Sequence, residues 1–318
     1  MKKIFSLFGL LLIGLLLVGC GDKNENTNKE LPTVELSSEV SIITPSGTPY
    51  LAIGGLLAND KIKIDLSNGA EGLKPALLNG SYDIVIAPVN LGTQLFNAGN
   101  SKFQMSHIIT TNNAYIVTKS ENKLDNIGDL AGQSVLAFGK SASLGIPGSV
   151  LKEVYEKNEL DISNIKYEYS SSAEVYSAFL SNATGAKYAL MSEPEISKLV
   201  LKDKLDVKTL DLAQVLGSTF AQACVYVNPE STNVEDINKV LNLIDEMVKY
   251  LNENPETYAD TVLQLDESRK FDAMGKDVIV RSIPLTNIVF KEAKTNKTDI
   301  ETILNILGVK LPNDAFYR

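Results

Sequence analysis

The sequence predicts an α/β protein of two α/β lobes joined by two crossing strands, with C-terminal helices packed on the first lobe. Three observations lead to this fold class. Short β-rich runs alternate with segments of helical spacing over residues 39–212, and the alternation starts again after residue 119. The last third of the chain carries long apolar helix faces instead. Because alternating strands and helices form parallel or mixed sheets covered by helices, two such series predict two lobes.

The first lobe is predicted over residues 39–118. Its strands are the runs VSIIT, IKIDL and YDIVIA, and helical patterns follow them near residues 49–58, 71–79 and 90–98. The order of elements is therefore βαβαβα. The next strand, YIVTK, lies near residues 114–119 and is predicted to cross to the second lobe.

The second lobe is predicted over residues 119–219. The strands SVLAF, IKYEY and YALMS precede helical patterns near residues 147–158, 172–182 and 194–202, and DVKTLDL is a further strand. The apolar run AQACVYVN, near residues 219–227, is predicted to return to the first lobe. Two crossing strands of this kind form a hinge.

The remainder, residues 220–318, is predicted to return to the first lobe and to continue as helices. The segment TNVE, residues 232–235, has the form of a capping box, and apolar residues then recur at spacings of 3 and 4. Asn254 and Pro255 close this helix and open the next. A second box, TDIE at residues 298–301, precedes another apolar face. We expect these helices to pack on the first lobe.

The N-terminus has the pattern of a secretory signal. Lys2 and Lys3 form a positive segment, residues 4–18 are apolar, and Gly19 is a small residue at the cleavage point. The apolar run is shorter than the roughly 20 residues that a membrane-spanning helix needs. The motif LVGC, residues 17–20, resembles the lipobox of bacterial lipoproteins, in which cleavage precedes the cysteine and the cysteine is lipidated.

Cys20 is therefore predicted to be acylated and to hold the mature chain on the extracytoplasmic face of the cell membrane. Residues 1–19 form the predicted signal peptide and residues 20–38 a flexible tether, because residues 21–31 are polar or charged with almost nothing apolar to bury. A coil of about 18 residues spans on the order of 20 to 25 Å. Two other interpretations stay open: an ordinary secretory signal with a chance cysteine, and a short membrane anchor.

The composition indicates a soluble globular protein with an ample core. The chain is 44% hydrophobic and 22% charged, close to the average for globular proteins. Its formal net charge is −9, and loss of residues 1–19, which hold two lysines and no acid, makes it more acidic still. This acidity argues against a nucleic-acid partner, which requires a basic surface. Cys224 is the only cysteine besides Cys20, and we expect it to be a buried strand thiol.

Small polar residues fill the loops that follow the predicted strands. Ligands bind beyond the carboxyl ends of such strands, where helix N-termini offer unpaired N–H groups. Hydroxyl and amide side chains either bind that ligand or cap the helix behind them, and both interpretations remain for each loop. The loops are residues 44–48, 68–70, 88–90, 141–143, 170–172 and 192–194.

Four segments resemble the extracytoplasmic solute-binding proteins of ABC importers, of the type that binds nitrate, sulfonate, taurine or thiamine-pyrimidine precursors. They read TPSGTPYLAIGGLL, LLNGSYDIVIAPVNLGTQLF, LDNIGDLAGQSVLAFGKSASLGIPGSVL and YALMSEPEISKLV, and the resemblance covers roughly residues 40–230. It implies the type II periplasmic-binding-protein fold, in which two lobes close on a small ligand. It also implies delivery of that solute to the permease subunits of the importer, by a protein that acts as a monomer without a cofactor.

Carried over by position, the resemblance implies ligand contacts from both lobes and both crossings. Alternatives remain for four of these residues: Glu193 as a first-turn helix acid, Tyr50 and Tyr115 as aromatics at the edge of the core, and Asn90 as a helix cap. The implied ligand-binding residues are Ser46, Gly47, Thr48, Tyr50, Pro88, Val89, Asn90, Asn113, Tyr115, Ser141, Ala142, Ser143, Glu193 and Gln222.

The nature of the solute is narrowed by the arginines. Arg269, Arg281 and Arg318 are the only ones and all follow the second lobe, so the lobe loops hold no guanidinium clamp for an amino-acid carboxylate. Lys140 is a candidate point charge. The expected solutes are a sulfonate- or nitrate-like anion held at helix N-termini, and a vitamin-precursor heterocycle stacked on an aromatic side chain such as Phe138.

Two other functional classes stay open, an enzyme on the same fold and a surface lipoprotein outside transport. The single histidine, His107, and the single cysteine of the mature domain provide no catalytic triad or Cys–His pair. Metal ligation is poorly supported for the same reason. We therefore expect a binding protein and not an enzyme.

Overall fold

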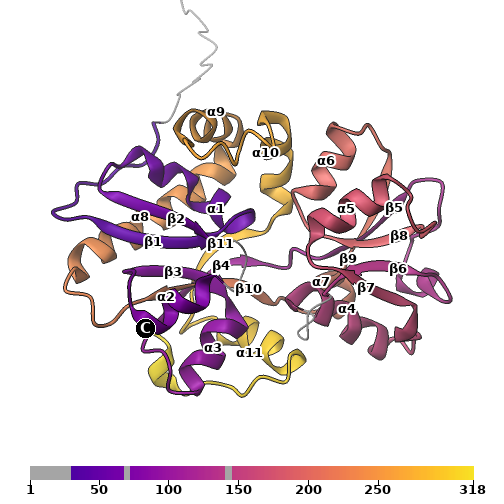
Figure 1. The fold of residues 1–318 in the computed structure, drawn as a ribbon, viewed down its shortest axis with the longest axis horizontal. Coiled ribbons are helices and arrows are strands. Elements are labelled where there is room, and N and C mark those ends of the chain that lie inside the picture. Colours follow the sequence, from indigo (N-terminus) through magenta and orange to yellow (C-terminus); the bar gives the residue numbers. More distant parts are fainter. Residues whose placement is uncertain (1–29, 68–71, 140–144) are drawn as a thin grey trace, which may run out of the picture. The chain divides into compact units, whose positions relative to one another are not determined.

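Two β-sheets organise the chain, one in each lobe (Figure 1). The computed structural model describes residues 30–67, 72–139 and 145–318. Six strands lie in the order β11-β4-β10-β3-β1-β2, and five lie in the order β7-β6-β8-β5-β9. Helices cover both sheets, so the predicted fold class, two α/β lobes, is confirmed.

The first sheet combines parallel strands from the N-terminal part with antiparallel strands from the C-terminal part. β1 is parallel to β2 and β3, whereas β10 is antiparallel to β3 and β4, and β11 to β4. β10 is apolar except for Gln222 and is buried along almost its whole length, because helices cover both faces of the sheet. The strands are β1 (Val40–Pro45), β2 (Ile62–Ser67), β3 (Ile84–Pro88), β4 (Gln104–Thr111), β10 (Ala221–Val227) and β11 (Ile288–Glu292).

The second sheet is built entirely from the middle of the chain. β6 is parallel to β7 and β8, and β5 runs antiparallel between β8 and β9. β5 therefore lies wholly in the second lobe, although we predicted lobe 1 to extend to residue 118. The chain passes between the sheets at residues 112–114 and again after α7. The strands are β5 (Tyr115–Lys119), β6 (Val135–Phe138), β7 (Ile165–Tyr169), β8 (Tyr188–Met191) and β9 (Val207–Asp211).

Helices lie on both faces of the first sheet. The helices of the N-terminal part are α1 (Thr48–Ile53), which continues as the 3₁₀ turn η1 (Gly54–Ala58), α2 (Leu73–Asn79) and α3 (Val89–Asn97). Those of the second lobe are α4 (Gly145–Lys157), α5 (Ser172–Leu180), α6 (Glu195–Leu201) and α7 (Leu212–Leu216). The C-terminal helices are α8 (Val234–Glu253), α9 (Pro255–Leu265), α10 (Lys276–Ser282) and α11 (Lys297–Ile306). Among the described residues, no helix is long and apolar enough to cross a bilayer.

Alternation along the strands divides the first lobe into two cores. Ile42 of β1 contributes to a core with α1, α8, α9 and α10, while its neighbour Ile43 faces a second core with α2, α3 and α11. Successive strand side chains point to opposite faces, so this division follows from the strand period of two. The second core continues through Ala114 into the second lobe. The C-terminal helices therefore pack on the first lobe, as predicted.

The two predicted capping boxes do not form. α8 begins after Asn233 and α11 after Asn296, and neither side chain caps its helix. The Asn233 side chain instead accepts a hydrogen bond from Ser38 Oγ at 2.7 Å and donates one to the carbonyl of Glu39 at 2.8 Å. A long-range contact with the N-terminal segment thus replaces the local cap.

Residues 31–38 lie on the first lobe, although they were predicted to belong to the flexible tether. Leu36 is buried in the core, and Asp236 at the start of α8 accepts hydrogen bonds from the backbone N–H groups of Ser37 and Ser38. These bonds hold the pKa of the Asp236 carboxyl well below its usual range. The polar segment that predicted disorder was residues 21–31, and the compact unit Leu31–Arg318 begins at its last residue.

Candidate functional site

The side-chain amide of Asn113 joins the two lobes at the first crossing. Its Nδ2 donates to Thr48 Oγ1 at 3.2 Å and to the carbonyl oxygen of Glu193 at 3.1 Å. Its Oδ1 accepts from the Glu193 backbone N–H at 2.7 Å. Thr48 follows β1 in the first lobe, and Glu193 follows β8 in the second. One buried amide therefore holds a loop from each lobe.

The second crossing is tied to the same point. Gln222 of β10 accepts from the Asn113 backbone N–H and donates to the Asn113 carbonyl, each at 3.2 Å. Ser192 Oγ donates to that carbonyl at 2.7 Å. We call Thr48, Asn113, Ser192, Glu193 and Gln222 the junction cluster. Four of its five members were predicted as ligand-binding residues, and the structure brings these four together.

The turn that presents Thr48 requires a glycine. Gly47 has φ +94°, a conformation that side-chain-bearing residues rarely adopt, and the space around its Cβ position is open. Pro49 occupies the first turn of α1, where its missing N–H has no intrahelical partner to lose. Ser46, next to this turn, is exposed. The sequence PSGTP thus forms a fixed turn that leaves Ser46 accessible.

Glu193 is a buried carboxylate shared between the lobes. Its side chain is 2% exposed, and Oε2 accepts from the backbone N–H of Ser197 at 3.0 Å. Oε1 lies 3.4 Å from Nη1 of Arg281, which also donates to Ser197 Oγ at 2.8 Å. Burial raises the pKa of the Glu193 carboxyl, and the bonds from Ser197 and the charge of Arg281 offset part of that increase.

Arg281 was not predicted as a site residue. The sequence analysis considered arginines of the lobe loops, whereas Arg281 contacts Glu193 from α10, one of the C-terminal helices drawn in Figure 1. Its guanidinium places a positive charge at the lobe junction, paired with the Glu193 carboxylate. No local pattern identifies this residue, because the two partners are 88 positions apart in the chain.

Tyr50 and Tyr115 are both engaged with protein groups. The Tyr50 ring stacks on Phe271 with centroids 4.6 Å apart, and its hydroxyl donates to Asp266 at 2.8 Å within the core of the first lobe. The Tyr115 hydroxyl donates to the carbonyl of Leu285 at 2.8 Å. Tyr50 thus anchors the start of α1, next to the loop that holds Ser46 and Gly47, in the core of the first lobe. Tyr115 forms a further contact between β5 and the C-terminal part.

Residues 88–90 occupy the start of α3. Pro88 is the N-cap, so Asn90 lies inside the helix and does not cap it. Val89 is fully buried, its carbonyl accepts from Tyr226 at 3.1 Å, and Asn90 is half-buried. Cys20, Lys140, Ser141, Ala142, Ser143 and the loop at residues 68–70 lie outside the described residues.

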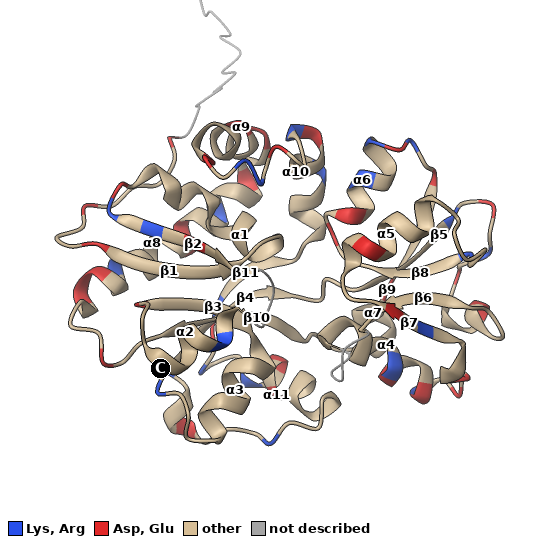
Figure 2. Cartoon of the chain, viewed as in Figure 1, with Lys and Arg blue, Asp and Glu red and all other residues tan. Residues whose placement is uncertain are grey.

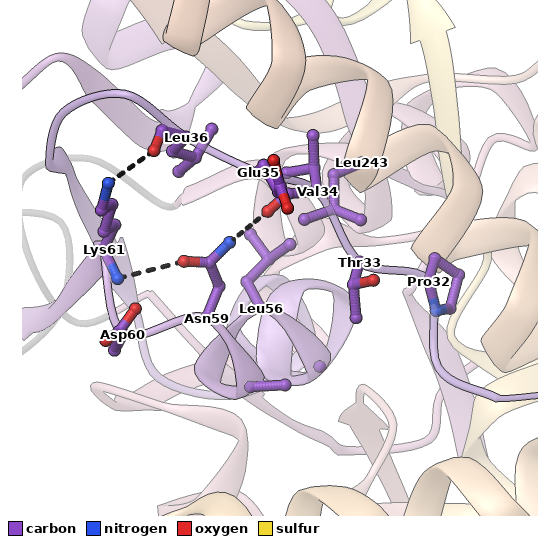
Figure 3. A pocket seen from close by; sticks show the side chains of 12 residues that line it. Pro32, Thr33, Val34, Glu35, Leu36, Leu56, Asn59, Asp60, Lys61 and Leu243 are labelled. Carbon is purple, nitrogen blue, oxygen red and sulfur yellow. Dashed lines mark hydrogen bonds between the residues drawn. The ribbon is translucent and has the colours of Figure 1, made fainter.

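A crevice of about 600 Å³ lies elsewhere on the first lobe, and none of the predicted site residues lines it. Figure 3 shows that the N-terminal segment forms one wall, while Leu56, Asn59 and Lys61 belong to the opposite side. Asn59 Nδ2 donates to the carbonyl of Val34 at 2.8 Å and Lys61 Nζ to that of Leu36 at 2.6 Å. These bonds hold residues 31–38 against η1, so we regard this crevice as a feature of that attachment.

The histidine and the cysteine considered for catalysis both lie in strands of the first sheet and pack within the protein. His107 in β4 stacks on Phe290 with centroids 4.0 Å apart, and burial lowers its pKa to about 4. Cys224 is a free, fully buried thiol in β10, and burial raises its pKa. Within the described ranges, no group of three or more His, Cys, Asp or Glu side chains is placed to hold a metal ion. Figure 2 shows acidic and basic residues interspersed over both lobes.

Solved structures identify the fold as that of periplasmic binding proteins. No family model and no curated relative matches the chain. A structure described as an ABC transporter from Parabacteroides distasonis matches with a TM-score of 0.72 at 17% identity, over 88% of this chain and 99% of that one.

Two further matches are sulfonate-binding proteins. The periplasmic aliphatic sulphonate binding protein SsuA of Escherichia coli has a TM-score of 0.66 at 14% identity, over 85% of this chain and 86% of that one. The alkanesulfonate-binding protein of Xanthomonas axonopodis pv. citri, bound to MOPS, has a TM-score of 0.60 at 16% identity, over 88% and 96%. At these identities the likeness concerns the fold.

Replacement of Asn113 tests the junction cluster. We expect Asn113→Ala to lower the free energy of unfolding by about 2 to 4 kcal/mol, because three side-chain hydrogen bonds are lost and buried partners remain unpaired. Urea denaturation measures this change. Asn100→Ala, at an exposed position in the same lobe, is the matched control. Equal stabilities of the two variants would show that the amide does not hold the junction.

The buried carboxyl of Glu193 predicts a pH dependence of stability. Because its pKa is raised in the folded protein, its contribution to stability is full below the unfolded pKa and is lost as the pH rises through the folded pKa. Glu193→Gln should therefore remove one component of the decline in stability above about pH 4.3. Denaturation of both proteins at a series of pH values measures it, with the exposed Glu168→Gln as control. Parallel pH profiles for wild type and Glu193→Gln would refute the assignment.

Proposed function

We propose that the protein is the substrate-binding lipoprotein of an ABC-type importer, which captures a small solute between its lobes and delivers it to the permease subunits. The observation that carries the proposal is the convergence of loops from both lobes, and of both crossings, on Asn113. The fold shared with sulfonate-binding proteins of known structure supports it. The alternatives of an enzyme or a non-transport lipoprotein receive no comparable support.

The solute is proposed to lie beside the junction cluster, since the polar groups of the cluster bind one another. Ser46, Gly47 and Asn90 of the first lobe are the proposed contacts that remain accessible or half-buried. Residues 141–143 are the proposed contacts from the second lobe. Thr48, Asn113, Glu193 and Gln222 would then hold these loops in position. Tyr50, Pro88 and Val89 support the loops, and Tyr115 borders the site.

The proposed solutes remain a sulfonate- or nitrate-like anion and a vitamin-precursor heterocycle. A charged sulfonate would be attracted by the Arg281 guanidinium, which is one-third exposed, and by N–H groups at helix starts. A neutral heterocycle would instead require an aromatic surface such as Tyr115 or Phe138. Binding favours the state in which both lobes touch the solute, and no bond of the solute is broken. We propose that the protein acts as a monomer, without cofactor or nucleic acid.

Solute binding is tested on the compact unit Leu31–Arg318, purified without denaturation. We expect native mass spectrometry to find a stoichiometric small molecule, or ethanesulfonate, nitrate or a hydroxymethylpyrimidine to raise the melting temperature by about 5 °C at a hundredfold excess over Kd. Asn90→Ala should weaken the effective ligand about tenfold by removing one polar contact, and Asn100→Ala should not. Absence of both a bound molecule and any shift across these classes would contradict the proposal.

Lipid anchoring is tested separately in the full chain. Wild type is expected in the membrane fraction and to incorporate labelled fatty acid, because two or more acyl chains are enough for stable anchoring. Cys20→Ser should abolish both, and Cys224→Ser, which changes only a buried thiol, should change neither label nor location. Labelling of the Cys20→Ser protein would exclude Cys20 as the anchor.

A further inference from the structure

Helices α6 and α10 form a further contact between the lobes, which adjoins the junction cluster through Glu193. α6 belongs to the second lobe and α10 to the C-terminal helices on the first, and the two pack against each other (Figure 1). Leu201 at the end of α6 packs against the core of the first lobe. Lys202 Nζ donates to the carbonyl of Ala273 at 2.6 Å just beyond it. We call this set of contacts the α6–α10 contact.

A buried charge lies at the centre of this contact. One oxygen of the Glu193 carboxylate is bound within its own lobe, by the N–H of Ser197, and the other faces Arg281 of the opposite lobe. Ser197 is fully buried and Glu193 nearly so, whereas the Arg281 side chain is 33% exposed. Separation of the helices would leave a desolvated carboxylate without its cationic partner, which is unfavourable.

The α6–α10 contact must break when the lobes separate, and so must the bond from Thr48 Oγ1 to the Glu193 carbonyl at 3.4 Å and that from the Tyr115 hydroxyl to the Leu285 carbonyl. Asn113 lies on the first connection and Gln222 at the start of β10, just after the second, so a hinge rotation about the connections can leave the bonds between them in place. Arg281 and Ser197 lie on helices that only tertiary packing brings together. An opening rotation about the connections therefore separates this pair of helices.

We propose that the α6–α10 contact is a latch that holds the two lobes together in the absence of solute, with Arg281 as its principal residue. Arg281 donates to Ser197 and pairs with Glu193, so one side chain of the first lobe binds two groups of the second. The latch contributes to the closed arrangement whether or not a solute is present. This inference concerns the lobe equilibrium and does not depend on the proposed function.

The test measures the distance between the lobes without any ligand. Spin labels are attached at Asn252→Cys in α8 and Ala173→Cys in α5, two exposed positions in different lobes of Leu31–Arg318. The only native cysteine of this unit, Cys224, is buried and does not react. We expect wild type to give one dominant distance by pulsed electron resonance.

Arg281→Met should add a longer distance, because it removes the charge that pairs with Glu193. The ratio of separated to joined lobes should rise about tenfold and not more, since a partly exposed charge pair contributes less than a fully buried one. Arg269→Met removes the same charge from an arginine that pairs with Asp272 in its own lobe, and should match wild type. Arg281→Lys, which keeps the charge but not the planar donors, should fall between them.

Ser197→Ala provides a second, uncharged variant if Arg281→Met fails to fold by circular dichroism. It removes the 2.8 Å acceptor of Arg281 and should also increase the separated population. The latch would be overturned if the distances in Arg281→Met superimposed on those of wild type. If Arg281→Met does not fold, the same result in Ser197→Ala would overturn it. A wild-type distribution already dominated by separated lobes would overturn it as well.

Discussion

The side-chain amide of Asn113 is the interaction on which the arrangement of the two lobes depends. Within the described residues, the chain connects the sheets at two short segments. The Asn113 side chain binds the loop after β1 and the loop after β8, and the Asn113 backbone binds the returning strand β10. An amide suits this position because it donates and accepts through one planar group. Because the amide is buried, loss of any of these bonds would leave a polar group without water to bind, which would destabilise the fold.

The lobe junction contains contacts of two kinds. Neutral hydrogen bonds near the crossings fix where the loops lie, and the charged contact between α6 and α10 adjoins them through Glu193. Separation of the lobes would break the charged contact and the bond between Thr48 and Glu193, whereas the bonds between Asn113 and Gln222 could persist. A binding protein benefits from both kinds of contact. The neutral bonds keep the loops preorganised, and the proposed α6–α10 latch biases the equilibrium between joined and separated lobes.

The sequence predicted the features that depend on local periodicity. The alternation of strands and helices, the apolar face of α8 and the order of the lobes all follow from spacings of two or of three and four residues. Features set by distant contacts were not predictable. Asn233 hydrogen-bonds the N-terminal segment and does not cap α8. The Tyr50 hydroxyl hydrogen-bonds Asp266, 216 positions along the chain. Arg281 pairs with Glu193 from a helix outside the lobe loops.

The proposed function rests on the binding of a solute between the lobes, beside the junction cluster. Hydrogen exchange of backbone amides, with and without the solute identified by native mass spectrometry, tests it most directly. We expect slower exchange in peptides from both lobes, around Thr48 and around Glu193, with no change near Asn59 in the crevice of the first lobe. Protection confined to one lobe, or to the crevice, would contradict it.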